Sequence, residues 1–169
     1  IDFNSRLLLA KFDTYAGNYG KAKKILIESD SIQPYPLPEL LNLNGLLNML
    51  ANKPQDAIKF YTLYVKTDTA DTDSLFTIVT RKIGDLTRFK KVKVDSRRMQ
   101  AYTIARLYAK TGKSAEAFKW LETAINYGFN YSYVLQHDVY LESLRKTAKW
   151  QTIISSISIK KYKKVTPVN

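Results

Sequence analysis

The chain of 169 residues is strongly basic, because 27 Lys and Arg residues outnumber 15 Asp and Glu residues and give a formal net charge of +12. Hydrophobic residues make up 45% and charged residues 25%, as in a globular domain with one sizeable core. The sequence contains no cysteine, which excludes disulfides, thiolate nucleophiles and cysteine metal ligands. No apolar run approaches the roughly 18 residues that a membrane span needs.

Two helical pairs are predicted in the first part of the chain, over residues 3–30 and 39–66. Pro34, Pro36 and Pro38 lie between the pairs, and such a run cannot occupy a helix interior. It therefore predicts an extended link followed by a helix that starts near residue 39. In the second pair we expect helices over 39–51 and 54–66, with Pro54 in the first turn of the latter.

The clearest helical pattern lies in residues 99–154. One helix face collects apolar residues at i, i+3, i+4 and i+7, namely Ala101, Ile104, Ala105 and Tyr108. Gly112 interrupts the pattern and can adopt a left-handed conformation. A second apolar face follows, made of Ala117, Phe118, Leu121, Ala124 and Ile125. We therefore expect two antiparallel helices joined by a short turn, with Ser114 as the N-cap of the second.

Pairs of small residues 12 positions apart recur along the chain, namely Ala10 and Ala22, Gly45 and Ala57, and Ala105 and Ala117. Four residues after each second member stands a bulky side chain, which is Leu26, Tyr61 or Leu121. This pattern resembles the tetratricopeptide repeat, whose period of about 34 residues is close to the spacing of Ala22 and Ala57 (57 − 22 = 35). The resemblance implies an all-α fold of antiparallel helix hairpins stacked into a right-handed tetratricopeptide-like α-solenoid.

Within one helical-repeat domain spanning 1–169, the resemblance implies repeats at 3–37, 38–70 and 98–130, with a degenerate helical segment at 71–97. The chain departs from the family pattern at Asp13, Asn44 and Asn48, which are polar where bulky apolar side chains are usual. Because the chain begins at Ile1, we expect a mature, trimmed or partial chain.

Residues 131–162, called the C-terminal segment below, resemble the terminal module that follows tetratricopeptide pairs in many bacterial proteins. Asp138–Arg145 matches its Asp-x-x-Leu-x-x-Leu-Arg element, and we expect Asp138 to be the N-cap of a short helix. The resemblance implies a cap that covers the last repeat with Leu141, Leu144, Trp150, Ile153 and Ile154. Packing within this cap, ahead of a role in an interface, is expected for Tyr127, Phe129, Tyr131, Tyr133 and Tyr140. A frayed tail is expected at 163–169.

A concave groove is implied by the resemblance, because inward-facing residues of the first helix of each repeat hold a peptide or a helix in such arrays. Carried over position by position, these residues are Asn4, Leu7, Leu8, Lys11 and Tyr15 in the first repeat, Asn42, Leu43, Leu46 and Met49 in the second, and Tyr102, Thr103, Arg106 and Lys110 in the third. The paired Lys and Asn that hold a terminal carboxylate in chaperone-binding members are not reproduced. The mixed apolar and basic lining favours an amphipathic or acidic partner.

A second candidate surface is the basic segment 81–98, with a local charge of +6. Its basic residues are Arg81, Lys82, Arg88, Lys90, Lys91, Lys93, Arg97 and Arg98. This charge is typical of a solvated face, and the functional alternative is a site for nucleic acid or another polyanion.

No catalytic, metal or cofactor site is predicted. His137 is the only histidine, and we expect it in a loop before the capped helix. The favoured function is a non-enzymatic scaffold that binds a protein or peptide, in a bacterial exported or envelope protein, with a periplasmic or extracellular location ahead of a cytoplasmic one. The alternatives are polyanion binding through 81–98 and an accessory domain of an enzyme. The sequence does not specify an oligomeric state.

Overall fold

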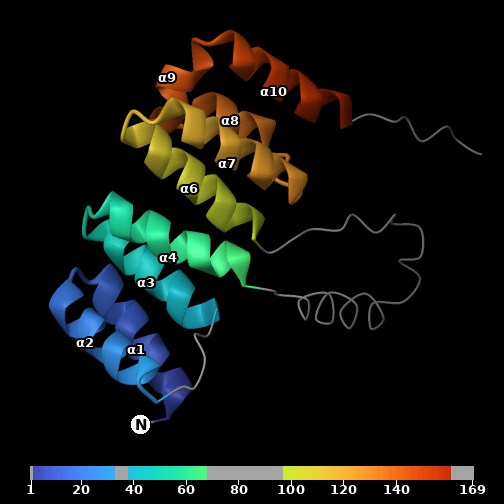
Figure 1. Ribbon diagram of the computed structural model, residues 1–169. Coiled ribbons are helices and arrows are strands. Elements are labelled where there is room, and N and C mark those ends of the chain that lie inside the picture. The colour runs from blue at the N-terminus through green and yellow to red at the C-terminus, as the bar shows by residue number, and fades with distance from the viewer. Residues whose placement is uncertain (1, 33–37, 68–96, 161–169) are drawn as a thin grey trace, which may run out of the picture. The chain divides into compact units, whose positions relative to one another are not determined.

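The computed structural model describes residues 2–32, 38–67 and 97–160 (Figure 1). In these ranges the protein is all-helical and contains no strand, which confirms the predicted all-α class. Within the same ranges no helix combines the length and the apolar character that crossing a bilayer requires. The chain divides into two compact units, residues 1–91 (unit 1) and 92–169 (unit 2). Of the degenerate segment expected at 71–97, all but residue 97 lies outside the described residues, as does the tail at 163–169.

Unit 1 contains two helix hairpins. The first consists of α1 (Phe3–Tyr15) and α2 (Tyr19–Asp30), and the second of α3 (Pro38–Leu50) and α4 (Pro54–Lys66). These bounds confirm the predicted pairs to within a residue, and Pro54 is the first helical residue of α4. The two helices of each hairpin pack together, and α1 and α2 also pack against α3. Their shared core is formed by Ala10, Ala22, Leu26, Leu40, Leu43 and Leu47.

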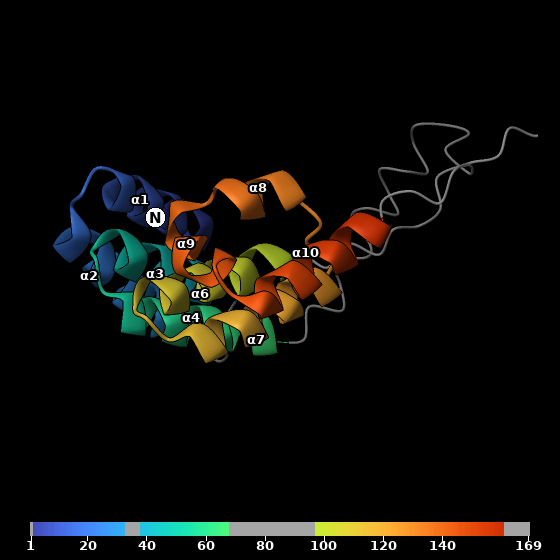
Figure 2. The same cartoon turned by 90° about the horizontal axis from the view of Figure 1, so that it is seen from above.

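Unit 2 begins with a third hairpin, α6 (Arg98–Lys110) and α7 (Ser114–Asn126). It continues through α8 (Ser132–His137), the 3₁₀ turn η2 (Val139–Leu141), α9 (Glu142–Arg145) and α10 (Ala148–Lys160) (Figure 2). The turn η2 packs against α6, and α10 packs against α8 and α9. The hairpin and the C-terminal segment therefore share one apolar core, which includes Ala105, Ala117, Leu121, Leu141, Leu144, Trp150 and Ile153.

The three hairpins turn in the same way. The residue at the turn has a positive φ in each, with values of 80° at Gly17, 55° at Asn52 and 76° at Gly112. The next residue donates its backbone N–H to the carbonyl five residues earlier, over 2.8 Å from Asn18 to Asp13, 2.8 Å from Lys53 to Asn48, and 2.9 Å from Lys113 to Tyr108. This left-handed cap favours glycine, and asparagine is among the few other residues that tolerate it.

The small residues of each hairpin are buried where its two helices meet. All five alanines of the predicted pairs are fully buried, and Gly45 is buried as well. Gly45 is required for packing, because a β-carbon there would lie 2.6 to 2.8 Å from three ring atoms of Tyr61. The polar residue Asp13 is accommodated because its carboxylate accepts a hydrogen bond from Asn18 and pairs with Lys21 at 3.4 Å.

Two local predictions are wrong. Ser114 is the first residue of α7 and not its N-cap, because helical geometry begins at Ser114 and Lys113 occupies the cap position. His137 is the last residue of α8 and not a loop residue. Its Nδ1 lies 2.8 Å from the carbonyl oxygen of Tyr133, one turn earlier, and its ring stacks on that tyrosine. The prediction for Asp138 is confirmed, because it caps η2 by accepting the backbone N–H of Tyr140.

Candidate functional site

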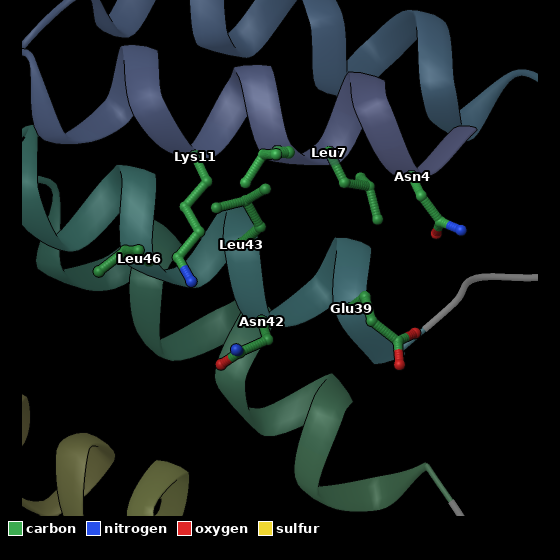
Figure 3. Close-up of a pocket in the computed structure, with 8 residues that line it drawn as sticks. Asn4, Leu7, Lys11, Glu39, Asn42, Leu43 and Leu46 are labelled. Atoms are coloured by element: carbon green, nitrogen blue, oxygen red, sulfur yellow. The ribbon is translucent and has the colours of Figure 1, made fainter. Parts of the chain in front are cut away.

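Unit 1 contains an open groove of about 330 Å³ between α1 and α3, called the α1–α3 groove below (Figure 3). It is lined by Asn4, Leu7, Leu8 and Lys11 from α1 and by Glu39, Asn42, Leu43 and Leu46 from α3. On each helix these residues fall at i, i+3, i+4 and i+7, so they form one face. Each α3 residue follows its α1 counterpart by 35 positions, as Glu39 follows Asn4 (39 − 4 = 35). The same four positions of two successive hairpins therefore form the groove.

The groove has an apolar centre and charged ends. Figure 3 shows Leu7 and Leu43 near the middle, with Lys11 toward one end and Glu39 toward the other. Leu43 is buried at the floor of the groove, whereas Leu8 is 55% exposed. Lys11 and Glu39 are exposed, and neither forms an ion pair with another residue in the described part of the chain. The arrangement can bind an apolar side chain between two opposite charges.

Local hydrogen bonds support the helices that form the groove. Asp2 caps α1 by accepting the backbone N–H and the hydroxyl of Ser5, and these hydrogen bonds lower the pKa of the Asp2 carboxyl. The hydroxyl of Tyr19 on α2 donates to the carbonyl of Leu50 at the end of α3 over 3.1 Å. Together with the shared core, this bond links the first hairpin to α3 and so maintains the spacing of the two groove walls.

In unit 2 the corresponding face of α6 contacts the C-terminal segment. Tyr102 is 4% exposed, stacks on Phe129 with ring centroids 4.2 Å apart, and donates its hydroxyl to Asp138 Oδ2 over 2.5 Å. Arg106 Nε lies 2.5 Å from the same oxygen, and its guanidinium carbon lies 4.8 Å from the ring centroid of Tyr140. Tyr102 and Arg106 thus join α6 to η2 instead of lining an open groove.

Asp138 is the centre of these contacts. Its side chain is only 6% exposed, and its own backbone carbonyl accepts a hydrogen bond from Arg145 Nη1 over 2.8 Å. Burial, reinforced by the hydrogen bond to this carboxylate, raises the pKa of the Tyr102 hydroxyl. The Asp138 carboxylate accepts charge-assisted hydrogen bonds from the Tyr102 hydroxyl and the Tyr140 backbone N–H, and it also forms the ion pair with Arg106.

The structure brings part of the predicted groove together. The predicted residues that line the α1–α3 groove are Asn4, Leu7, Leu8, Lys11, Asn42, Leu43 and Leu46. Two others lie elsewhere: Tyr15 is an exposed residue at the end of α1, and Met49 is half-buried on α3. Sequence reasoning missed Glu39, although its spacing of 35 residues from Asn4 would have identified it.

The remaining predicted residues lie in unit 2 or outside the described ranges. The hydroxyl of Thr103 donates to the carbonyl of Met99, and Lys110 Nζ lies 5.5 Å from the ring centroid of Tyr140. In the basic segment, Arg97 lies over the ring of Tyr127 at 4.7 Å, and Arg98 is the first residue of α6. Its other members are outside the described residues, namely Arg81, Lys82, Arg88, Lys90, Lys91 and Lys93.

In the part of the chain that the structure describes, no group of three or more His, Asp or Glu side chains could hold a metal ion. Comparisons with family models, curated proteins and solved structures found no match.

Proposed function

We propose that this protein is a non-enzymatic interaction scaffold that binds a peptide segment of a partner protein in the α1–α3 groove. The observation that supports this function is the groove itself, which combines an exposed leucine, an apolar floor and two charged ends. Apolar clefts with a few well-placed polar groups are the usual form of binding sites. The charged ends would orient the peptide, and the leucines would contact its apolar side chains.

The proposed scaffold is a tetratricopeptide-like solenoid. Its support is the common left-handed turn of the three hairpins and the offset of 35 residues that relates the two groove walls. The C-terminal segment is proposed to cap the last hairpin. In support of this role, Leu141, Leu144 and Trp150 are buried in the same core as α6 and α7. A solenoid needs such a cap because its last repeat would otherwise expose an apolar face.

The proposed function is tested by selecting binders for the full chain from a phage-displayed library of random peptides. Selected peptides are synthesised, and their affinity is measured by fluorescence anisotropy. Leu8→Glu should weaken binding at least ten-fold, about 1.4 kcal/mol, because the new carboxylate must lose water beneath an apolar ligand. Leu8 is suited to this test because it is 55% exposed, so its replacement should leave the fold intact.

The matched control is Ile27→Glu on α2. Ile27 is 59% exposed and does not line the groove, so this variant makes the same kind of charge change at similar exposure. It should leave the affinity unchanged. Equal weakening by both substitutions, or a selection that enriches no peptide, would overturn the proposed function.

A further inference from the structure

The third hairpin shows which side chain pairs with the cation at one of these helix positions. Lys11 on α1 corresponds to Arg106 on α6, because the same offset of 95 residues relates Ala10 to Ala105 (106 − 11 = 95). Both positions carry a cation, and in unit 2 that cation is paired with the carboxylate of Asp138. In unit 2 the packed C-terminal segment therefore supplies a carboxylate to the cation at this repeat position.

The segment bound in unit 2 combines an acidic residue with apolar neighbours. Asp138 is the extended cap residue, with φ of −69° and ψ of 116°, and the 3₁₀ turn η2 that follows places Leu141 in the core, where it is fully buried. Between them, Tyr140 contacts Arg106 through its ring face. The carboxylate of Asp138 pairs with the cation, the ring of Tyr140 contacts α6, and Leu141 enters the core.

In unit 1 the corresponding cation is Lys11, and no carboxylate among the described residues pairs with it. The groove also contains an acidic residue, Glu39, at the end opposite Lys11 (Figure 3). Lys11 and Glu39 occupy positions seven residues apart in the repeat, which corresponds to an offset of about 10 Å along the helix axis. An extended peptide covers that distance in about three residues.

Building on the proposed function, we infer that the groove binds an extended peptide segment whose opposite charges lie about three residues apart. Its acidic side chain pairs with Lys11, its basic side chain pairs with Glu39, and the apolar residues between them contact Leu7, Leu8 and Leu43. The charges determine the direction in which the segment lies. A segment with charges of one sign, or with none, lacks one or both of these partners.

The peptide selection described above tests this inference when it is repeated with the Lys11→Glu/Glu39→Lys double variant. Wild-type chain should enrich peptides in which an acidic and a basic residue flank apolar residues in a fixed order. The double variant should enrich the reverse order, because the charges at both ends of its groove are exchanged. Enrichment without charge order, or the same order with both proteins, overturns the inference and leaves the proposed function standing. A library that yields no binder to either protein overturns both.

A single peptide from the wild-type selection provides the quantitative test. Lys11→Glu should reduce its affinity at least ten-fold, and replacement of the peptide's acidic residue by glutamine should remove most of that difference. Lys24→Glu on α2 is the control, because it makes the same change of net charge at an exposed residue outside the groove. If Lys24→Glu weakens binding as much as Lys11→Glu does, the inference is overturned, because general electrostatic attraction then explains the effect.

Discussion

Replacement of Gly45 by alanine should destabilise unit 1, although alanine is the better helix former. The new β-carbon would lie 2.6 to 2.8 Å from Cε1, Cδ1 and Cζ of Tyr61, whose side chain is buried. Carbon atoms in contact prefer about 3.5–4.0 Å, so the ring or the helix must move by roughly 1 Å. Overpacking of this kind costs about 1–3 kcal/mol, whereas the gain in helix propensity is at most about 1 kcal/mol. We expect a net loss of about 1 kcal/mol in the free energy of unfolding.

The other two hairpins supply the compensating change. Where the second hairpin pairs Gly45 with Tyr61, the first pairs Ala10 with Leu26 and the third pairs Ala105 with Leu121, all of them buried. Tyr61→Leu alone should be destabilising because it leaves a cavity beside glycine. In the Gly45→Ala/Tyr61→Leu double variant the two changes should offset each other, with a favourable coupling energy of about 1–2 kcal/mol.

The assay is urea unfolding of the full chain followed by far-ultraviolet circular dichroism. Tyr61→Phe is the control, because phenylalanine keeps the three ring atoms that the new β-carbon would meet, so it should not relieve the cost of Gly45→Ala. The reasoning is refuted if Gly45→Ala is as stable as wild type. The reasoning is also refuted if Gly45→Ala lowers the free energy of unfolding by the same amount in the wild type and in the Tyr61→Leu variant.

Three further predictions follow from other contacts. Asp138→Ala should lower the free energy of unfolding of unit 2 by about 2–3 kcal/mol, because it leaves the partly buried guanidinium of Arg106 unpaired. Tryptophan fluorescence measures this loss, and Glu122→Ala, which breaks an exposed ion pair in the same unit, should cost less than about 1 kcal/mol; equal losses would contradict the assignment. Burial raises the pKa of Tyr61 to about 12, and the unfolded chain ionises near pH 10, so stability should fall by up to about 1.4 kcal/mol per pH unit between these values. Tyr61→Phe should lessen that fall in urea titrations above and below pH 10, and parallel pH profiles would contradict it. Gly112→Ala should cost about 1–2 kcal/mol, because φ is 76° there although the space is open, and Gly112→Asn should cost less; thermal unfolding that ranks asparagine below alanine would contradict this reading.

Local patterns in the sequence were sufficient to predict the all-helical class and the helix hairpins in the described part of the chain. Proline and glycine mark the ends of the hairpins, and apolar residues at helical spacing mark their faces, so the extent of the first hairpin and the bounds of α3 and α4 could be predicted from the sequence. The resemblance to the tetratricopeptide repeat identified most of the residues that line the α1–α3 groove, because equivalent positions of successive repeats lie on the same helix face. Glu39 was not predicted, although it follows the predicted groove residue Asn4 by the same 35 residues that relate the other positions.

Only the tertiary structure decided which of these positions stay open. Tyr102 and Arg106 occupy the repeat positions equivalent to Leu7 and Lys11. They nevertheless contact Asp138, which lies more than thirty residues later in the chain. The tertiary structure also revealed that Gly45 is required by the ring of Tyr61 and not merely by the close approach of two helices. Periodicity describes one helix at a time, whereas burial and ion pairing depend on how segments distant in sequence pack together.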